Sequence, residues 1–209
     1  MIYLNDHIDE LDITEALRQV SPQRAAYALR YRRELDQRLS IAVFLLLQQA
    51  LREEYGIKEV PEFAFGPNGK PYLKEHPEIH FNLSHCPRAA LCVVENHPVG
   101  CDVEAVPDEF DMDLCRHCFN EEEVASILAS DSPTLAFTTL WTQKEALLKL
   151  TGIGLSDMSQ LSTFHLSPLT SHLSPSTFHL PMSLPTVPMS TPFVPTPDLP
   201  SRVQNMQSL

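Results

Sequence analysis

Residues 79–104 read IHFNLSHCPRAALCVVENHPVGCDVE, and this stretch decides the fold class. Apolar and polar residues alternate through residues 79–84, which is the period of a strand with one buried face. Residues 89–94 and 99–103 predict two more strands, and residues 63–73 add a strand, a Gly/Pro/Asn turn and another strand. The polar face of the first of these segments carries His80, Asn82 and Ser84, and His85 stands at its end.

Helices are expected before and after the strands along the chain. Ser21 and Pro22 predict a helix start, because serine is a good N-cap and proline suits the first helical position. The helical pattern runs from there toward Tyr55, and further helices are predicted over residues 121–129 and 135–150. Since a long helix precedes the strands and other helices follow them, the order predicts an α+β fold rather than a parallel doubly wound sheet.

The overall composition excludes several classes of protein. The chain has 209 residues, of which 15 are basic and 27 acidic, giving a formal net charge of −12. It therefore lacks the basic surface that nucleic acids and anionic membranes require. The longest apolar run, residues 41–47, is far shorter than the ~20 residues that cross a bilayer, and the first ten residues carry no secretory signal. Five cysteines in such a chain favour reduced thiols. We expect a cytoplasmic monomer with neither nucleic acid nor membrane as a partner.

The composition changes sharply at residue 159. Residues 159–209 contain 9 of the 18 prolines, no glycine, and only Asp198 and Arg202 as charged residues. Closely spaced prolines oppose both helices and strand ladders, so we expect a low-complexity tail that supplies no strands. A natural extension and an out-of-frame end both fit this composition. The predicted organisation is an N-terminal α+β half over residues 1–98, a C-terminal half over residues 99–158, and the tail over residues 159–209.

The strand predicted over residues 99–103 contains one carboxylate, and a second directly follows it. Asp102 and Glu104 are two positions apart, so they project from the same face, about 7 Å from one another along the strand. This spacing lets both reach one hard cation, and Mg²⁺ is commonly held by one or two carboxylates plus substrate phosphates. In isolation, the same pattern is more often found as two solvated charges on an exposed face.

The last predicted helix adds a third acidic residue. Trp141, Glu145 and Lys149 recur every four residues and share one face of the helix. Glu145 is a candidate third carboxylate for the cation, and Lys149 is a candidate contact to phosphate. The simpler interpretation is a buried tryptophan beside a surface Glu–Lys pair, which is worth only ~0.3–0.5 kcal/mol.

Other motifs are disfavoured. Residues 115–118 read CRHC, but no second ligand pair follows to complete a zinc site. Cys86 adjoins His85, whereas a catalytic thiol and its imidazole are usually far apart in sequence. Residues 66–69 lack the spacing of a phosphate-binding loop.

Taken in order, the motifs resemble the Sfp-type 4′-phosphopantetheinyl transferases. Each segment is short, but the ordered set covers most of the patterned region and is specific. The matching segments are SP at residues 21–22, RLS at 38–40, GKP at 69–71, FNLSH at 81–85, VGCDVE at 99–104, FNEEE at 119–123, and WTQKEALLK with its GxGL at 141–155.

The resemblance implies an activity and a metal site. The expected enzyme moves the phosphopantetheine arm of coenzyme A to a serine of an apo acyl or peptidyl carrier protein. Asp102, Glu104 and Glu145 are then expected to hold Mg²⁺ against the pyrophosphate, which neutralises its charge. The carboxylate that accepts the serine proton is either Glu145 or one of those in residues 119–123.

The resemblance also implies contacts to coenzyme A. Lys149 is expected to act in catalysis beside Glu145, adding positive charge at the phosphates together with Lys144. Ser84 and His85 are expected to touch phosphate groups, His85 at the 3′-phosphate. The remaining coenzyme contacts implied are Arg38, at the same end of the coenzyme as His85, and Lys70 and Pro71 near the adenine.

Family members of this type consist of two similar α+β halves related by a pseudo-twofold axis. Their second half continues with strands that pack on the Trp141 helix, and here the proline-rich tail takes that place. We therefore expect an incomplete second half, in which Leu140, Leu147 and Leu148 lose part of their cover. Two other functions stay open: a catalytically impaired remnant that binds coenzyme A or a carrier, and a Mg²⁺-dependent phosphohydrolase.

Overall fold

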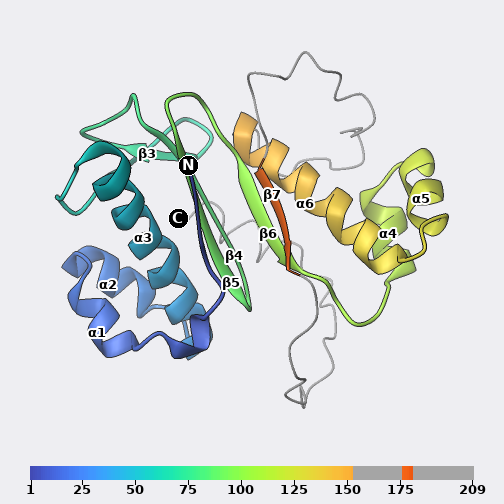
Figure 1. Ribbon diagram of the computed structural model, residues 1–209, viewed down its shortest axis with the longest axis horizontal. Coiled ribbons are helices and arrows are strands. Elements are labelled where there is room, and N and C mark those ends of the chain that lie inside the picture. The colour runs from blue at the N-terminus through green and yellow to red at the C-terminus, as the bar shows by residue number, and fades with distance from the viewer. Residues whose placement is uncertain (153–175, 181–209) are drawn as a thin grey trace.

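The computed structural model describes residues 1–152 and the strand at residues 176–180 (Figure 1). Within this part of the chain, helices and strands are mixed in an α+β arrangement. The elements are β1 (Ile2–Asn5), the 3-10 helix η1 (Ile8–Glu10), α1 (Ile13–Arg18), α2 (Pro22–Ala28), α3 (Glu34–Tyr55), β2 (Phe63–Phe65), β3 (Pro71–Leu73), β4 (His80–Cys86), β5 (Ala89–Glu95), β6 (Cys101–Ala105), α4 (Met112–Cys118), α5 (Glu121–Leu128), α6 (Pro133–Thr151) and β7 (Ser176–Leu180).

The central layer is an antiparallel sheet in the order β1-β5-β4. Helix α3 covers one face of this sheet (Figure 1). Phe81 and Leu83 of β4 point into the resulting core, where they meet Val43 and Leu47 of α3. Most of residues 39–51 are buried around this layer, because a helix that is apolar nearly all round requires cover on most sides.

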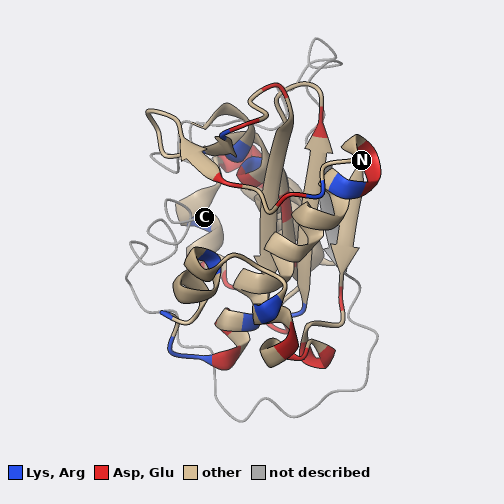
Figure 2. Ribbon diagram, turned by 90° about the vertical axis from the view of Figure 1, so that its left-hand side faces the viewer, with Lys and Arg blue, Asp and Glu red and all other residues tan. Residues whose placement is uncertain are grey.

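Strand β6 lies on the other face of the sheet. Cys101 and Val103 pack there against Leu91 and Val93 of β5, and α6 packs on β6 in turn (Figure 1). The fold therefore has the layer order α3, sheet, β6 with its neighbours, and α6. Figure 2 shows that the charged residues lie mainly in the helices and loops around these strands. No helix in the described residues is both long and apolar enough to span a bilayer.

The predicted helix starts and stops have visible causes. Ser21 caps α2 as expected, with its Oγ accepting a hydrogen bond from the backbone N–H of Arg24 at 3.1 Å. Gly56 ends α3 in the left-handed conformation, with φ 70°. The single helix predicted from Ser21 to Tyr55 is wrong, because the chain leaves the helical conformation between α2 and α3. The elements β1, α1 and α4 were not predicted.

Strand β7 corrects the prediction for the proline-rich tail. Within residues 159–209 the structure describes this strand alone, and it pairs in parallel with β6. The tail was expected to supply no strands, but residues 176–180 read STFHL and lie between two prolines, so all five backbone N–H groups are available for pairing. The remainder of the expected tail lies outside the described residues.

The predicted loss of cover on α6 is corrected for one of its three leucines, Leu148. Leu148 is only 5% exposed, and Leu140 packs against the cluster that contains Phe119 and Ile127. Leu147 is partly buried. Leu148 keeps its cover because α6 contacts β6, β7 and α5, whereas Leu140 and Leu147 are only partly covered.

Gly100 allows α6 to approach β6. A methyl group on this glycine would lie 2.1 Å from the carbonyl oxygen of Ala146 and 2.4 Å from the backbone nitrogen of Leu150. Because both atoms belong to the helix backbone, no side-chain rotation relieves the clash. We predict that Gly100→Ala lowers the free energy of unfolding by about 3 kcal/mol, the upper end of the usual cost of overpacking, as measured by urea denaturation.

Gly66→Ala is the matched control, since its added carbon would meet only the Lys70 carbonyl oxygen at 3.6 Å. Equal stability of the Gly100 and Gly66 variants would show that α6 does not need this close approach.

Candidate active site

Two polar side chains of β4 hold β6 in place. The backbone N–H of Cys101 donates to Oδ1 of Asn82 at 2.8 Å, and that of Val103 approaches Oγ of Ser84 at 3.4 Å. Both side chains come from the polar face of β4 that the alternation predicted. The role of Asn82 was missed, although its place between His80 and Ser84 was the available signal.

Ser84, Asp102 and Lys149 meet in one hydrogen-bonded cluster. Ser84 Oγ donates to Asp102 Oδ1 at 2.6 Å. The Lys149 ammonium group donates to the same Oδ1 at 2.7 Å and to Ser84 Oγ at 2.9 Å. The three residues come from β4, β6 and α6, and are separated by 18 and 47 positions in the chain. Their meeting requires the whole stack of layers described above.

Glu145 belongs to the same charged group. It lies one helical turn before Lys149 on α6 and is 6% exposed. Burial alone would lower the pKa of Lys149, but the negative charges of Asp102 and Glu145 outweigh it and raise that pKa above its ordinary value. Two carboxylates from different elements, Asp102 on β6 and Glu145 on α6, therefore act on the Lys149 ammonium group. Their convergence on a metal ion stays a prediction.

The donor set for a metal ion is only partly assembled. Oδ2 of Asp102 is buried and has no hydrogen-bond partner among the described residues, so an acceptor oxygen is available there. Glu104 lies on β6 beyond Asp102 and is partly buried. However, the described part of the chain contains no group of three or more acidic, histidine or cysteine side chains placed to hold a metal ion.

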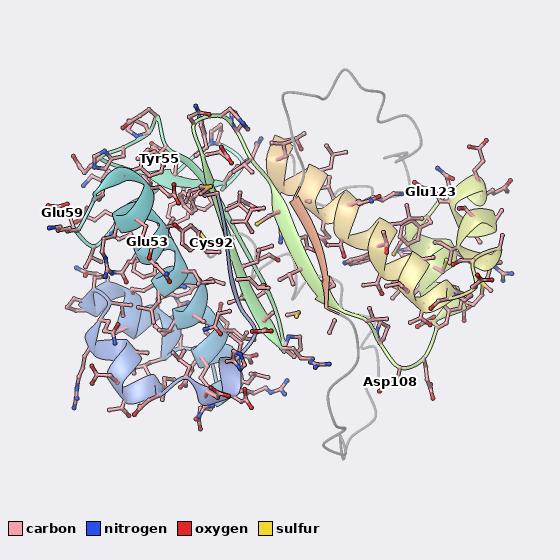
Figure 3. The ribbon with its side chains drawn as sticks, viewed as in Figure 1. Glu53, Tyr55, Glu59, Cys92, Asp108 and Glu123 are labelled. Carbon is pink, nitrogen blue, oxygen red and sulfur yellow. The ribbon has the colours of Figure 1, made fainter. Side chains whose placement is uncertain are left out.

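Lys144 occupies a different environment from the predicted phosphate contact. Its ammonium group lies 2.6 Å from Oε2 of Glu123 on α5, and both side chains are fully buried. It also lies 4.7 Å from the centre of the Phe119 ring. Figure 3 shows Glu123 where α5 meets α6. The prediction for Lys144 is corrected because helix rotation turns it about 100° away from Glu145, toward α5.

This ion pair also narrows the choice of a proton acceptor. Glu123 was one of the carboxylates considered in residues 119–123, but it is committed to Lys144 and, as part of a capping box, to the backbone N–H of Asn120. Glu121 and Glu122 are exposed on the first turn of α5. Glu145 is the remaining carboxylate of the original choice that faces the Ser84–Asp102–Lys149 cluster.

The GKP motif lies at the hairpin formed by β2 and β3. Pro71 begins β3, opposite Phe65 of β2. The Lys70 ammonium group donates to the carbonyl oxygens of Val99 and Leu150, both at 3.0 Å. The side chain is therefore directed at β6 and α6, which differs from the contact near the adenine that was expected for Lys70.

The arginines of the N-terminal segment differ in how their charges are balanced. Arg38 donates to the carboxylate of Glu34 and to the backbone carbonyl of Asp9, both at 2.6 Å. Arg24 is buried and donates to both oxygens of Ser40, and no carboxylate pairs with it among the described residues. Burial lowers the pKa of the Arg24 guanidinium. A buried guanidinium without a carboxylate is costly, and the two oxygens of Ser40 offset part of that cost here. The coenzyme contact expected for Arg38 stays a prediction.

His85 is the last residue but one of β4. Its side chain is partly buried, and alternation along the strand directs it to the α3 side of the sheet, opposite Ser84. The structure thus places Ser84 and His85 on different faces, although they are neighbours in the sequence.

Comparison with known proteins identifies relatives of the chain. A family model described as the 4′-phosphopantetheinyl transferase superfamily matches residues 98–183. The 4′-phosphopantetheinyl transferase psf-1 of Bacillus pumilus is 30% identical over 156 residues, which are 71% of this chain and 66% of that protein. The 4′-phosphopantetheinyl transferase Sfp of Bacillus subtilis (strain 168) is 26% identical over 158 residues, 74% of this chain and 70% of Sfp. The 4′-phosphopantetheinyl transferase gsp of Aneurinibacillus migulanus is 32% identical over 139 residues, 65% of this chain and 57% of gsp.

The chain thus spans between 57% and 70% of the length of these three relatives. Asp102, Glu145 and Lys149, which the fold brings together from β6 and α6, all lie inside the range matched by the family model. Both the similarity and the ordered motifs lead to one assignment: this chain belongs to the 4′-phosphopantetheinyl transferase superfamily.

Proposed function

We propose that this protein transfers the 4′-phosphopantetheine arm of coenzyme A to a serine hydroxyl of an apo acyl or peptidyl carrier protein. The observation that carries the proposal is the cluster of Ser84, Asp102 and Lys149, at 2.6–2.9 Å from one another, beside Glu145. The names of the relatives support the reaction class. The chemistry requires a serine oxygen to bond to the β-phosphorus while the bond from that phosphorus to the bridging oxygen breaks, releasing adenosine 3′,5′-bisphosphate.

The residues around Asp102 fit a magnesium ion in the chemistry of their donors. The buried Oδ2 of Asp102 is an oxygen acceptor without a hydrogen bond among the described residues, and hard oxygen donors are those that Mg²⁺ prefers. We assign the site to Asp102, Glu104 and Glu145. A magnesium ion held there would supply positive charge to the pyrophosphate oxygens.

The protein's own side chains have separate roles in this proposal. Lys149 places a fixed positive charge where the pyrophosphate accumulates negative charge. Glu145 accepts the proton that leaves the carrier serine, since Glu123 is occupied by Lys144. Ser84 contacts a phosphate group from the β6 side of β4, and His85 contacts the 3′-phosphate from the α3 side. Arg38, which lies on α3, binds the same end of the coenzyme as His85.

The remaining parts of the proposal concern organisation and surroundings. We infer two halves with pseudo-twofold symmetry, residues 1–98 and 99–158, with coenzyme A bound between them, and a separate region over residues 159–209. The family resemblance supports this division, and the pairing of β7 with β6 adds one strand to the second half. We further propose that the protein acts as a monomer in the cytoplasm.

One assay tests the reaction. The purified protein is incubated with an apo carrier protein, coenzyme A and Mg²⁺, and the carrier is weighed by mass spectrometry. The proposal predicts that the carrier gains one phosphopantetheine group, and that omission of Mg²⁺ prevents the gain. Nucleotide released without carrier modification would instead indicate a phosphohydrolase, and neither product would indicate a remnant that only binds.

A further inference from the structure

Lys70 joins three distant parts of the chain through a single ammonium group. It lies at the end of the turn between β2 and β3, and donates to the Val99 carbonyl 29 positions away and to the Leu150 carbonyl 80 positions away, each at 3.0 Å. Val99 lies in the loop that leads into β6, and Leu150 lies in the last turn of α6. One side chain therefore connects the hairpin to both elements that carry the acidic residues and Lys149.

The chemistry of this contact suits a cation. The last four carbonyl groups of a helix have no partner within the helix, and that end carries a partial negative charge. Lys70 satisfies the carbonyl of Leu150 at this end of α6. Gly152 caps the helix in the left-handed conformation, and a side-chain carbon there would lie 3.5 Å from Cδ of Lys70. The Lys70 stem thus fills the space beside the cap.

The two carbonyls that Lys70 binds lie next to the reacting groups. Val99 precedes Asp102 by three residues, and Leu150 directly follows Lys149. Between them, Gly100 lies against the backbone of α6. A displacement of either carbonyl would change the separation of Asp102 and Lys149, whose hydrogen bond is 2.7 Å long.

We propose that Lys70 is a positioning residue, which sets the distance between Asp102 and Lys149 by binding the carbonyls of Val99 and Leu150. This inference rests on the proposed transferase function and deepens it. In this role Lys70 acts through β6 and α6 and leaves the binding of coenzyme A unchanged. A residue that contacts the coenzyme would instead change its binding.

The test compares Lys70→Met and Lys70→Arg in steady-state transfer assays. For Lys70→Met we expect kcat to fall about 10- to 100-fold, the size of effect caused by misplacing reacting groups by about 1 Å, while KM for coenzyme A changes less than about twofold. Lys70→Arg, which keeps a cation of similar reach, restores at least part of kcat. Lys74→Met is the matched control, because Lys74 directly follows β3 but is exposed and forms its 3.0 Å ion pair with Glu62 in solvent. The kinetics of this variant remain those of the unmodified protein.

Several results would overturn this inference. A raised KM for coenzyme A at unchanged kcat would make Lys70 a coenzyme contact, and unchanged kinetics in Lys70→Met would remove its role. Where Lys70→Met does not fold, Lys70→Gln, which keeps a neutral donor, replaces it under the same criteria. If the unmodified protein shows no transfer, the proposed function fails. The positioning role of Lys70 is then tested separately by hydrogen exchange. Lys70→Met must speed exchange of the amides in the last turn of α6, and unchanged exchange refutes the role.

Discussion

Asp102→Asn is expected to reduce carrier modification by about 10²- to 10³-fold, the loss typical of removing one stabilising charge or donor from a reacting centre. Asp102 Oδ1 accepts hydrogen bonds from both Ser84 and Lys149, and Oδ2 is the buried oxygen assigned to the magnesium ion. The amide has the same shape but no charge, so it weakens the hold on Lys149 and cannot replace the carboxylate as a metal ligand. Initial rates of phosphopantetheine transfer, followed by carrier mass, provide the measurement.

Asp108→Asn is the control for this change. Asp108 is exposed in the loop after β6 (Figure 3). Replacing it by asparagine makes the same chemical change as Asp102→Asn, a few residues away from the cluster. Its rate is expected to match that of the unmodified protein. Thermal unfolding of both variants separates lost chemistry from lost structure: if folded Asp102→Asn retains full activity, the cluster is not the reacting centre.

Lys144→Met is expected to lower the free energy of unfolding by about 3–5 kcal/mol, because it removes the positive charge from a buried ion pair. Lys144 and Glu123 have no solvent-exposed side-chain surface, and 2.6 Å separates their charged atoms. Methionine has a similar length and flexibility, so the loss arises from the charge of Glu123 rather than from a cavity. Denaturant unfolding followed by circular dichroism measures this effect.

The double variant Lys144→Met, Glu123→Gln tests the cause. Glutamine removes the buried negative charge at residue 123 and retains an oxygen for the backbone N–H of Asn120, so most of the lost stability returns. If the double variant is as unstable as Lys144→Met, the penalty does not come from the charge. As a control at an exposed pair, Lys74→Met leaves unfolding unchanged, since the Lys74–Glu62 pair lies in solvent.

The sequence predicted most of the elements because their signals are local. Alternation identified β4, and residues 89–94 were also predicted as a strand, where β5 lies. Ser21 and Gly56 marked a helix start and a helix stop that the structure confirms. β1 was missed because four residues with partly exposed side chains give almost no periodic signal. α4 was missed because Cys115 and Cys118, which face a buried cluster, resembled half of a metal site.

The site was predicted in part for the same reason. The faces carrying Ser84, Asp102 and Lys149 follow from the strand and helix periods, so each residue could be selected from its own segment. The environment of Lys144 could not, because only the packing of α5 on α6 brings Glu123 to it. The burial of Arg24 could not be predicted either. Residues 18–38 contain six arginines, and the sequence does not show which of them the fold covers.

By itself, the sequence determined the α+β class, the chemical family and the candidate carboxylates, because these depend on short-range periodicity and on ordered motifs. The tertiary structure alone decided which charges meet. Ser84, Asp102 and Lys149 are joined across 18 and 47 positions, Lys70 reaches carbonyls 29 and 80 positions away, and Lys144 turns to Glu123 instead of the site. Electrostatic and hydrogen-bond partners act over a few ångströms in space, and the separation along the chain sets no limit on them once the layers have packed.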